Sequence, residues 1–330
     1  MTPNLSCQNS LFGLSFSEEE AQVLVLPVPW DVTCSFRRGT AYSPALIQEL
    51  SSQIDLYHPL YNDVWKKGIH LLSHPAECLS KNETLSPTAI QCISDFDHGR
   101  EQDSSHLRQL NQACQELITT VSKTIESIVN KKKFPVLLGG DHSLSLGAIQ
   151  GLKKQYQGDG IGILQLDAHM DLRHNYQGFT HSHASVMAQA IQEHHVTQLV
   201  QVGVRDFCEE EVNTTQSDAC DVVSFTDGAI QENLFLGDTW HDLCQKILEP
   251  LPKKVYVSFD MDVLNPGLCP NTGTPVPGGL DTSQCLYLVQ QVMQTGREVV
   301  GLDLVEVGHD SFDCGLASHL LYQLILRTSS

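Results

Sequence analysis

Short apolar runs constrain the fold of this chain more than any other feature of its sequence. Runs rich in Val, Ile and Leu recur at residues 21–30, 134–140, 160–169, 196–206, 253–262 and 297–307. Within these runs the apolar residues are continuous and do not alternate with polar ones, as is typical of strands covered on both faces. The runs therefore predict strands that lie buried inside a sheet.

Longer segments with helical periodicity separate these runs. Examples are residues 104–130, 183–194, 238–249, 282–296 and 315–327. Repeated strand–helix–strand order predicts parallel pairing with right-handed crossovers. No linker rich in Ser, Gly or Pro and no internal repeat divides the 330 residues. We therefore expect one α/β domain over residues 1–330, a three-layer αβα sandwich with a mostly parallel central sheet.

The charge of the chain restricts its partners. Lys and Arg number 20 against 39 Asp and Glu, a formal net charge of −19. Such a balance repels phosphate backbones and anionic membrane surfaces and attracts cations. No stretch approaches the roughly 18 apolar residues of a membrane span. We expect metal ions or a cationic small-molecule substrate as partners, and neither nucleic acid nor a membrane.

The cysteines and the N-terminal segment indicate the cellular compartment in which the protein is expected. Eleven cysteines are dispersed along the chain without a Cys-x-x-Cys pair. An odd number in a chain of this size favours reduced thiols over a disulfide framework. The first 20 residues lack the basic and apolar regions of a secretory signal. A cytoplasmic location is therefore expected.

Three polar clusters follow three of the predicted strands. They lie in GGDHSLSLG (139–147), DAHMD (167–171) and SFDMD (258–262). Parallel sheets bind ligands beyond the carboxyl ends of their strands, so these clusters are expected to converge. Together they supply two imidazoles and four carboxylates: His142, Asp167, His169, Asp171, Asp260 and Asp262.

The spacing within the clusters favours metal binding. Residues i, i+2 and i+4 of an extended segment share a face, so Asp167, His169 and Asp171 point the same way. A solvated acidic loop is the alternative, and His142 alone would be compatible with a structural histidine. However, carboxylates beside a buried strand are unfavourable unless paired or metal-bound.

Six ligands are too many for one ion. An oxygen-rich set with imidazole and no thiolate suits Mn²⁺, or Fe²⁺ or Co²⁺, better than structural zinc. Two ions about 4 Å apart can hold a hydroxide nucleophile at neutral pH. The residues therefore predict a two-metal centre.

GGDHS, DAHMD and SFDMD, in this order, resemble the three signature motifs of the ureohydrolase (arginase/agmatinase) family. The resemblance extends to residues 25–51, 272–280 and 301–307. It implies an arginase-like fold, two Mn²⁺ ions per chain and a homo-oligomer, a trimer or hexamer. Asp167 and Asp260 would bridge the ions. His142 and Asp171 would complete one coordination sphere, and His169 and Asp262 the other.

The resemblance also assigns the catalytic groups. Glu306, in DLVEV, would pair with a substrate guanidinium, and His183, in SHASVM, would relay a proton to the leaving amine. Asp171 would accept a hydrogen bond from the bridging hydroxide. The roles are chemically consistent, because a guanidinium needs a carboxylate partner and an amine cannot leave as an anion. Glu306 alone could be a surface residue, and His181 rivals His183 by spacing.

The segment 171–190 is most similar to agmatinases of the microbial type, which implies hydrolysis of agmatine to putrescine and urea. Agmatine carries two positive charges, which suits the acidic chain. A guanidinobutyrase, an arginase, a formimidoylglutamase and a non-catalytic metal-binding protein of the same fold remain alternatives. The chain departs from the family pattern at Asn265, Cys269, Asn271 and 308–315. We expect these departures on the pocket rim, where they bear on the substrate more than on the metals.

Overall fold

Strands from the whole length of the chain form one parallel sheet in the computed structural model, which describes residues 10–61, 63–215 and 220–329. The strand order is β2-β1-β3-β8-β7-β4-β5-β6, and every pairing of these strands is parallel. The strands are β1 (Val23–Val28), β2 (Ile69–Leu71), β3 (Phe134–Gly139), β4 (Ile161–Leu166), β5 (Val196–Val204), β6 (Asp221–Thr226), β7 (Lys254–Asp260) and β8 (Glu298–Val305).

Each of the six apolar runs contains a strand, as predicted. The sequence did not predict β2 and β6, which lie at the two edges of the sheet. β2 is only three residues long, and β6 is partly exposed along its length. Neither strand has the continuous apolar run that marks the others, because edge strands bury less of their surface.

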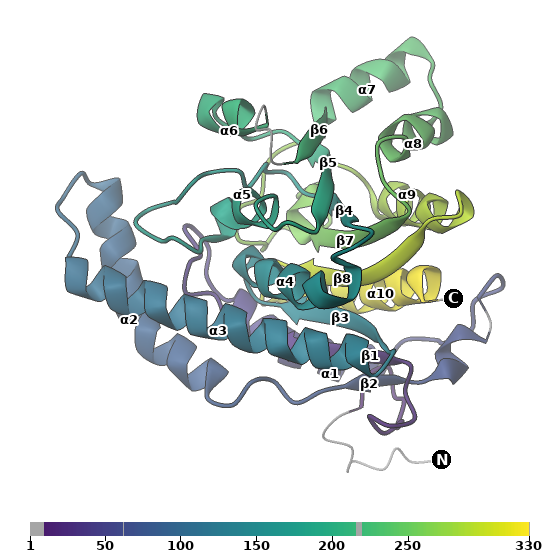
Figure 1. Ribbon diagram of the computed structural model, residues 1–330, viewed down its shortest axis with the longest axis horizontal. Coiled ribbons are helices and arrows are strands. Elements are labelled where there is room, and N and C mark those ends of the chain that lie inside the picture. Colours follow the sequence, from purple (N-terminus) through teal and green to yellow (C-terminus); the bar gives the residue numbers. More distant parts are fainter. Residues whose placement is uncertain (1–9, 62, 216–219, 330) are drawn as a thin grey trace.

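Helices cover both faces of the sheet (Figure 1). They are α1 (Ser43–Ser51), α2 (Cys78–Asp97), α3 (Ser104–Asn130), α4 (Ser145–Tyr156), α5 (Val186–Ala190), α6 (Glu209–Thr214), α7 (Asp227–Leu236), α8 (Trp240–Leu248), α9 (Thr282–Gln294) and α10 (Ser311–Thr328). One apolar core joins α2, α3, α4 and α5 to one face of the sheet. A second core joins α1, α7, α8, α9 and α10 to the other. The expected three-layer αβα sandwich is thus confirmed.

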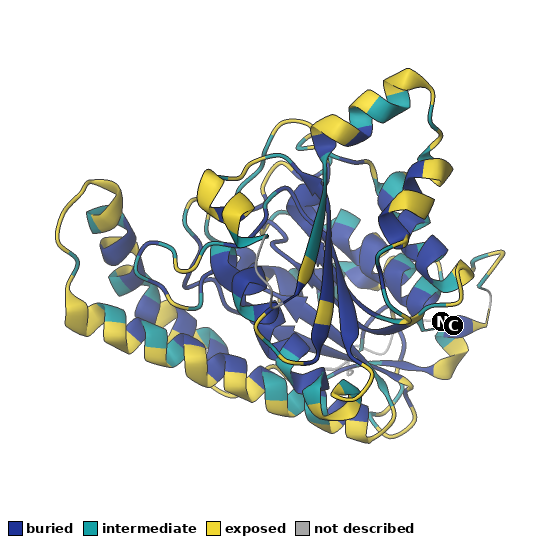
Figure 2. Cartoon of the chain, turned by 45° about the horizontal axis from the view of Figure 1, so that its top comes forward, coloured by how far each residue is buried: buried dark blue, intermediate teal, exposed yellow. Residues whose placement is uncertain are grey.

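The continuous apolar runs reflect these two cores. Along β1, Val23 and Val25 face the core with α1 and α10, whereas Leu24 and Leu26 face the core with α3 and α4. All four side chains are buried, and Figure 2 shows the central strands buried along nearly their whole length. Residues on both faces must therefore be apolar, which removes the usual alternation.

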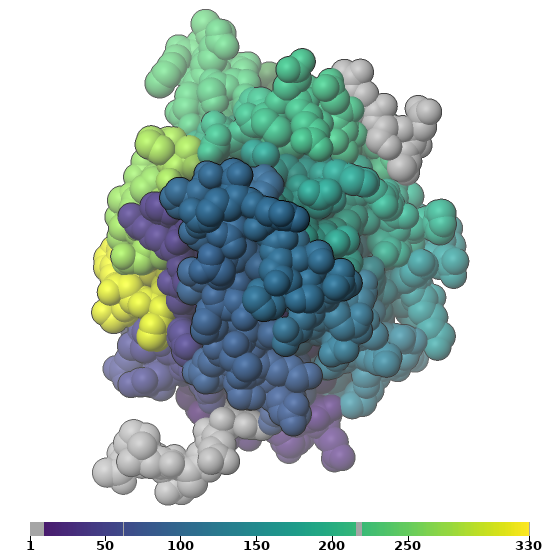
Figure 3. Space-filling view, turned by 90° about the vertical axis from the view of Figure 1, so that its left-hand side faces the viewer, coloured from purple at the N-terminus to yellow at the C-terminus, as the bar shows by residue number. Residues whose placement is uncertain are grey.

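Helix α3 shows how the predicted periodicity becomes packing. Its bounds match the predicted 104–130, and the Asp103 carboxylate accepts hydrogen bonds from the backbone N–H groups of Ser105 and His106. Its buried side chains recur every three or four residues, and α3 packs on α2 and α4. Figure 3 views the molecule from the side that α2 and α3 cover.

The helix predicted over residues 183–194 is shorter in the structure. It begins with the 3₁₀ turn η4 (His183–Ser185), and α5 then ends at Ala190.

None of the described helices is both long and apolar enough to cross a membrane. Ten cysteines lie in the described part of the chain, and all of them are free. Cys7 lies outside the described residues. The cysteines therefore contribute to packing in this structure as small apolar residues.

Candidate metal centre and substrate pocket

The polar clusters follow the four central strands of the sheet, β3, β8, β7 and β4, at their carboxyl ends. His142 opens the 3₁₀ turn η3 (His142–Leu144), and the 167–171 cluster follows β4. Asp260 ends β7, and Asp262 lies in the 3₁₀ turn η5 (Met261–Val263). Glu306 follows β8 directly. The topology thus brings these residues to the carboxyl-terminal edge of the sheet, the side on which the strands end.

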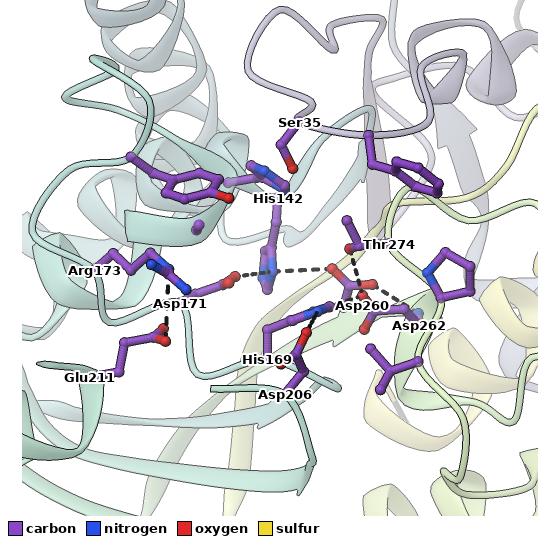
Figure 4. A pocket seen from close by; sticks show the side chains of 16 residues that line it. Ser35, His142, His169, Asp171, Arg173, Asp206, Glu211, Asp260, Asp262 and Thr274 are labelled. Atoms are coloured by element: carbon purple, nitrogen blue, oxygen red, sulfur yellow. Dashed lines mark hydrogen bonds and ion pairs between the residues drawn. The ribbon is translucent and has the colours of Figure 1, made fainter. Parts of the chain in front are cut away.

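A cavity of about 310 Å³ opens at this edge (Figure 4). Most of the predicted residues line it: His142, His169, Asp171, His183, Asp260 and Asp262. Asp167 and Glu306 are buried and lie within 4 Å of the lining residues His142 and His183, respectively.

The predicted metal ligands form two groups. In the first, His142 Nδ1 lies 3.1 Å from Asp167 Oδ2 and 2.9 Å from Asp171 Oδ2. Asp260 Oδ2 lies 3.3 Å from the same nitrogen. The other oxygen of Asp167, Oδ1, faces His169, so this carboxylate lies between the two histidines.

In the second group, His169 Nδ1 lies 3.0 Å from Asp262 Oδ2 and 3.5 Å from Asp167 Oδ1. Within each of two sets, His142–Asp167–Asp171 and Asp167–His169–Asp262, one ligand atom per residue lies within 4.8 Å of the others. Asp167 belongs to both groups, as a bridging ligand would.

The chemistry of these groups fits divalent cations. His142 Nδ1 is buried and makes no hydrogen bond of acceptable geometry with any described residue, although three carboxylates surround it. Burial and the charge of Asp167 raise the pKa of Asp171 to about 6, and burial and the charge of Asp262 raise the pKa of Asp260. Carboxylates crowded in this way are stabilised as anions by a cation, and oxygen with imidazole nitrogen suits Mn²⁺.

A buried hydrogen-bond chain orients His142. Its Nε2 lies 2.9 Å from Ser258 Oγ, and Ser258 Oγ donates to the Asp303 carboxylate at 3.0 Å. Asp303 also accepts hydrogen bonds from Tyr256 Oη at 2.8 Å and from the Phe259 N–H at 2.9 Å. Because the Ser258 hydroxyl donates to Asp303, it accepts from His142 Nε2, which leaves the Nδ1 lone pair directed at the carboxylates.

Ser258→Ala is therefore expected to weaken Mn²⁺ binding about 10- to 100-fold, as is usual when a metal-ligating histidine loses its partner. Equilibrium dialysis measures the affinity. Tyr256→Phe is a matched control, because it removes one donor to Asp303 and leaves the bond to His142 in place. Equal Mn²⁺ affinity in Ser258→Ala and the unaltered protein would contradict this role.

Two of the predicted site residues have left-handed backbone conformations. The φ angles are 55° at Asp171 and 56° at Glu306, which is uncommon outside glycine. The Asp171 carbonyl accepts hydrogen bonds from the N–H groups of Met187 and Ala188, and the Glu306 N–H donates to the Gly140 carbonyl. Strain of this kind amounts to about 1–3 kcal/mol and concentrates at functional sites.

Glu306 and His183 lie side by side next to the metal-ligand groups. Glu306 Oε1 is 3.7 Å from His183 Nδ1 and accepts a hydrogen bond from the His142 N–H at 2.9 Å. Among the described residues, neither Glu306 Oε2 nor His183 Nε2 has a hydrogen-bond partner, although both atoms are buried. Burial lowers the pKa of His183, but Glu306, together with Asp171 and Asp141, raises it overall.

Space beside Glu306 depends on a glycine. A side chain at Gly273 would place its Cβ only 2.8 Å from Glu306 Oε2. Gly273 lies within the 272–280 segment that resembles the family loop, so the loop approaches the carboxylate only because this position carries no side chain.

His181, the rival of His183, is outside the cavity. Its ring nitrogens contact the side-chain oxygens of Gln189 and Gln115. His183 lines the cavity. The geometry therefore favours His183 for a role in proton transfer.

The expected place of the family departures was wrong. Asn265, Cys269, Asn271 and residues 308–315 do not line the cavity. The Asn265 side chain caps its own turn by accepting from the Gly267 N–H at 2.9 Å, and Asn271 contacts Asp313. Asn265 and Asn271 thus make contacts within and next to the loop. Their closeness to the third motif in sequence could not show that they do not line the cavity.

Other residues of the cavity wall were not predicted. They are Ser35, Phe36, Arg173, Tyr176, Ala184, Asp206, Glu211, Thr274, Pro275 and Val276. Asp206 follows β5, just as the predicted clusters follow their own strands. This position in the sequence could have indicated that Asp206 lies near the site. Arg173 and Tyr176 lie in the segment 171–190 that pointed to the substrate.

The chain is similar to known proteins along nearly its whole length. The model of the arginase family matches residues 21–326. The N(1)-aminopropylagmatine ureohydrolase of Thermus thermophilus is 31% identical over 310 residues, covering 93% of this chain and 90% of that protein. The agmatinase of Bacillus subtilis is 27% identical over 316 residues, covering 93% of this chain and 92% of that protein.

Solved structures confirm the fold. The agmatine ureohydrolase of Thermoplasma volcanium superposes with a TM-score of 0.72 at 24% identity, covering 96% of this chain and 92% of that one. Arginase from Medicago truncatula gives a TM-score of 0.66 at 23% identity, covering 93% and 87% of the two chains. With a family match over nearly its whole length, the chain belongs to the arginase family of hydrolases.

Proposed function

We propose that the protein is a binuclear manganese amidinohydrolase that hydrolyses agmatine to putrescine and urea. One observation carries the proposal: two His–Asp groups that share Asp167 open into the same cavity as the His183–Glu306 pair. The names of the relatives, agmatinase and aminopropylagmatine ureohydrolase, support the same chemistry.

The two groups would hold one ion each. His142 and Asp171 would serve one ion and His169 and Asp262 the other, with Asp167 and Asp260 shared. The position of Asp167 in both groups supports this division. Bound manganese would supply the nucleophile by lowering the pKa of a coordinated water towards neutrality.

Glu306 would bind the guanidinium of the substrate. Its Oε1 is already fixed by the His142 N–H, whereas its Oε2 has no partner among the described residues. A guanidinium stays protonated at neutral pH and pairs strongly with a carboxylate. The contact between Glu306 and His142 would place the guanidinium carbon beside the metal groups.

Asp171 and His183 would move protons. Asp171 would accept a hydrogen bond from the nucleophile and direct it at the guanidinium carbon. The amine leaves only after it gains a proton, and His183 is placed to donate one. The carboxylates near His183 raise its pKa against the effect of burial, and this direction favours the protonated form that donates.

N(1)-aminopropylagmatine is a second candidate substrate. The observation that favours it is the 31% identity to a ureohydrolase named for that compound. It shares the guanidinium and the four-carbon spacer of agmatine and differs by a longer cationic tail.

Urea release from manganese-loaded protein tests the proposal, with both compounds compared against arginine, guanidinobutyrate and guanidinopropionate. We expect the two compounds with cationic tails to give the highest kcat/KM. Preference for arginine or guanidinobutyrate would keep the reaction and change the substrate. Absence of urea with two manganese ions bound would overturn the proposal, and formimidoylglutamate would then be the next substrate to assay.

Manganese is also expected to stabilise the fold. An ion that binds only the folded state at about 100 times its Kd adds about 2.7 kcal/mol per site to the free energy of unfolding. Differential scanning calorimetry with and without Mn²⁺ measures the shift in Tm, and EDTA should reverse it. An unchanged Tm would show that the described groups bind no manganese.

Three further expectations come from the sequence. They are a cytoplasmic location, a single domain over residues 1–330 and, from the family resemblance, a homo-oligomer of three or six chains. Cell fractionation, a single calorimetric unfolding transition and light scattering test them in turn.

A further inference from the structure

We propose that Gln165, held in place by Gln201, is a positioning residue for the metal centre, because it orients the carboxylate of Asp167. This inference rests on the proposed function, which assigns Asp167 as a ligand of both ions. Gln165 lies in β4, two residues before Asp167, and Gln201 lies in the neighbouring strand β5. Neither glutamine lines the cavity.

A row of polar side chains crosses the sheet at the level of Gln165. Its members are paired directly from strand to strand, in the order Ser224, Gln201, Gln165, Ser258 and Asp303. The residues two positions earlier in β4, β5 and β7 belong to the core with α2, α3, α4 and α5, so the row lies on that face of the sheet. At this level polar side chains interrupt the apolar runs of the strands.

Hydrogen bonds connect half of this row to the metal-ligand cluster. Ser224 Oγ donates to Gln201 Oε1 at 2.8 Å, and Gln201 Nε2 donates to Gln165 Oε1 at 2.6 Å. Gln165 Nε2 in turn donates to Asp167 Oδ2 at 2.8 Å. Gln201 Nε2 also donates to the Met170 carbonyl at 2.7 Å. The row therefore holds the 167–171 cluster at two points.

The acceptors at the cluster fix the direction of both amides. A carboxylate and a carbonyl oxygen can only accept, so the nitrogen of Gln165 must face Asp167 and the nitrogen of Gln201 must face Met170. The oxygen of Gln165 then faces the nitrogen of Gln201, and the oxygen of Gln201 faces the Ser224 hydroxyl. Every hydrogen bond along the row has a donor and an acceptor in this arrangement alone.

The carboxylate of Asp167 is thereby fixed at both oxygens. Oδ1 accepts a hydrogen bond from the His169 N–H at 2.7 Å, and Oδ2 accepts the one from Gln165. A carboxylate oxygen has two lone pairs, so each oxygen keeps one for a metal ion. Oδ1 lies beside His169 and Oδ2 beside His142, the histidines of the two metal-ligand groups. Without the Gln165 amide, the carboxylate could turn about its Cβ–Cγ bond.

Packing alone does not account for these buried amides. Gln165 and Gln201 are both 0% exposed. Apolar side chains of similar size would be stabilised by burial at about 25 cal/mol per Å² and would need no partners. A buried amide is unfavourable unless it is hydrogen-bonded. What the two glutamines contribute is therefore their hydrogen bonds, which end at the metal-ligand cluster.

Gln165→Met tests the inference, because it keeps the length of the side chain and removes the donor to Asp167. We expect the Kd for Mn²⁺, measured by equilibrium dialysis of the metal-free protein, to rise about 10- to 100-fold. Gln198→Met is the matched control. Gln198 is also a buried glutamine of β5, but its amide donates to the Asp221 carbonyl at 3.0 Å, away from the cluster. This control should bind Mn²⁺ as the unaltered protein does.

A purely structural role of Gln165 predicts a different result. Gln165→Met would then lower the Tm of the metal-free protein, while the folded variant would bind Mn²⁺ with unchanged affinity. That outcome would overturn the inference, and so would an equal loss of affinity in Gln198→Met.

Gln201→Met provides a second test, which also applies if Gln165→Met does not fold. It leaves the donor to Asp167 in place but removes the bond that holds the Gln165 oxygen, so Mn²⁺ affinity should fall less than in Gln165→Met. Unchanged affinity in Gln201→Met would overturn the proposed role of Gln201 in holding Gln165.

The dialysis needs no substrate, which separates this inference from the proposed reaction. Failure of the manganese-loaded protein to hydrolyse any guanidine would overturn the reaction, and the Mn²⁺ affinities would still decide the role of Gln165. If the unaltered protein bound no Mn²⁺, the metal centre and this inference would both be overturned.

Discussion

Asp167→Asn is expected to abolish manganese binding at both groups and to lower the rate of urea release at least about 10³-fold. Loss of a mere partner of a metal ligand reduces metal affinity or activity about 10- to 100-fold, and Asp167 is itself proposed as a ligand of both ions. One of its oxygens faces His142 at 3.1 Å, and the other faces His169 at 3.5 Å. A single neutral amide therefore weakens both groups at once.

The variant should remain folded, which makes its loss of activity interpretable. Asn keeps the volume of Asp, and its remaining oxygen can still accept the hydrogen bond that the His169 N–H now donates to Asp167. Circular dichroism checks the fold, and plasma mass spectrometry counts the bound manganese. Asp159→Asn is the control, because Asp159 lies before β4, at its opposite end, and pairs with Lys254 on the surface. Two manganese ions bound to Asp167→Asn would refute the shared position of this carboxylate.

The second large effect is expected from His183→Ala. General acid catalysis by a positioned side chain contributes about 10²- to 10⁴-fold, so kcat should fall by a factor in this range. Manganese content should not change, because His183 belongs to neither metal-ligand group. The affinity for substrate should change little, since Glu306 and the cavity walls remain.

His181→Ala is the matched control for this variant. It removes an imidazole two residues away whose partners are Gln189 and Gln115 outside the cavity. Its kcat should stay close to that of the unaltered protein. If His181→Ala lost the larger share of kcat, the assignment of the proton donor to His183 would be wrong.

The sequence predicted the sheet well because burial on both faces leaves a strong signal. Every strand of the sheet interior lies in a predicted run, whereas the edge strands β2 and β6 carry no comparable signal. The order of the strands could not be predicted, since nothing local in residues 298–305 shows that β8 lies between β3 and β7.

The candidate site was predicted as far as its residues cluster in sequence. Motifs spaced by two residues share a face, so the sequence could associate Asp167 with His169 and Asp260 with Asp262. Ser258 and Asp303 were missed as a pair, because 45 positions separate them and only strand pairing brings them into contact.

The residues at the rim of the cavity were the hardest to predict from the sequence. Asn265 and Asn271 follow the third motif closely in sequence but do not line the cavity. Asp206 and Arg173 are charged residues that line the cavity, and each is one polar residue among many in the sequence. Only their exposure and partners in the structure distinguish Asp206, with a free carboxylate, from Arg173, which is compensated by Glu211.

The place of β8 also has a consequence for biosynthesis. Strands β1–β3 form one block and strands β4–β7 another, and β8, the last strand along the chain, joins them in the middle of the sheet. A nascent chain that has not yet exposed residues 298–306 to solvent can form neither the complete sheet nor the position of Glu306. Many long-range contacts must therefore form late, which slows folding. His142 follows β3 in one block, whereas Asp171 follows β4 and Asp260 ends β7 in the other, so the approach of these side chains also depends on β8.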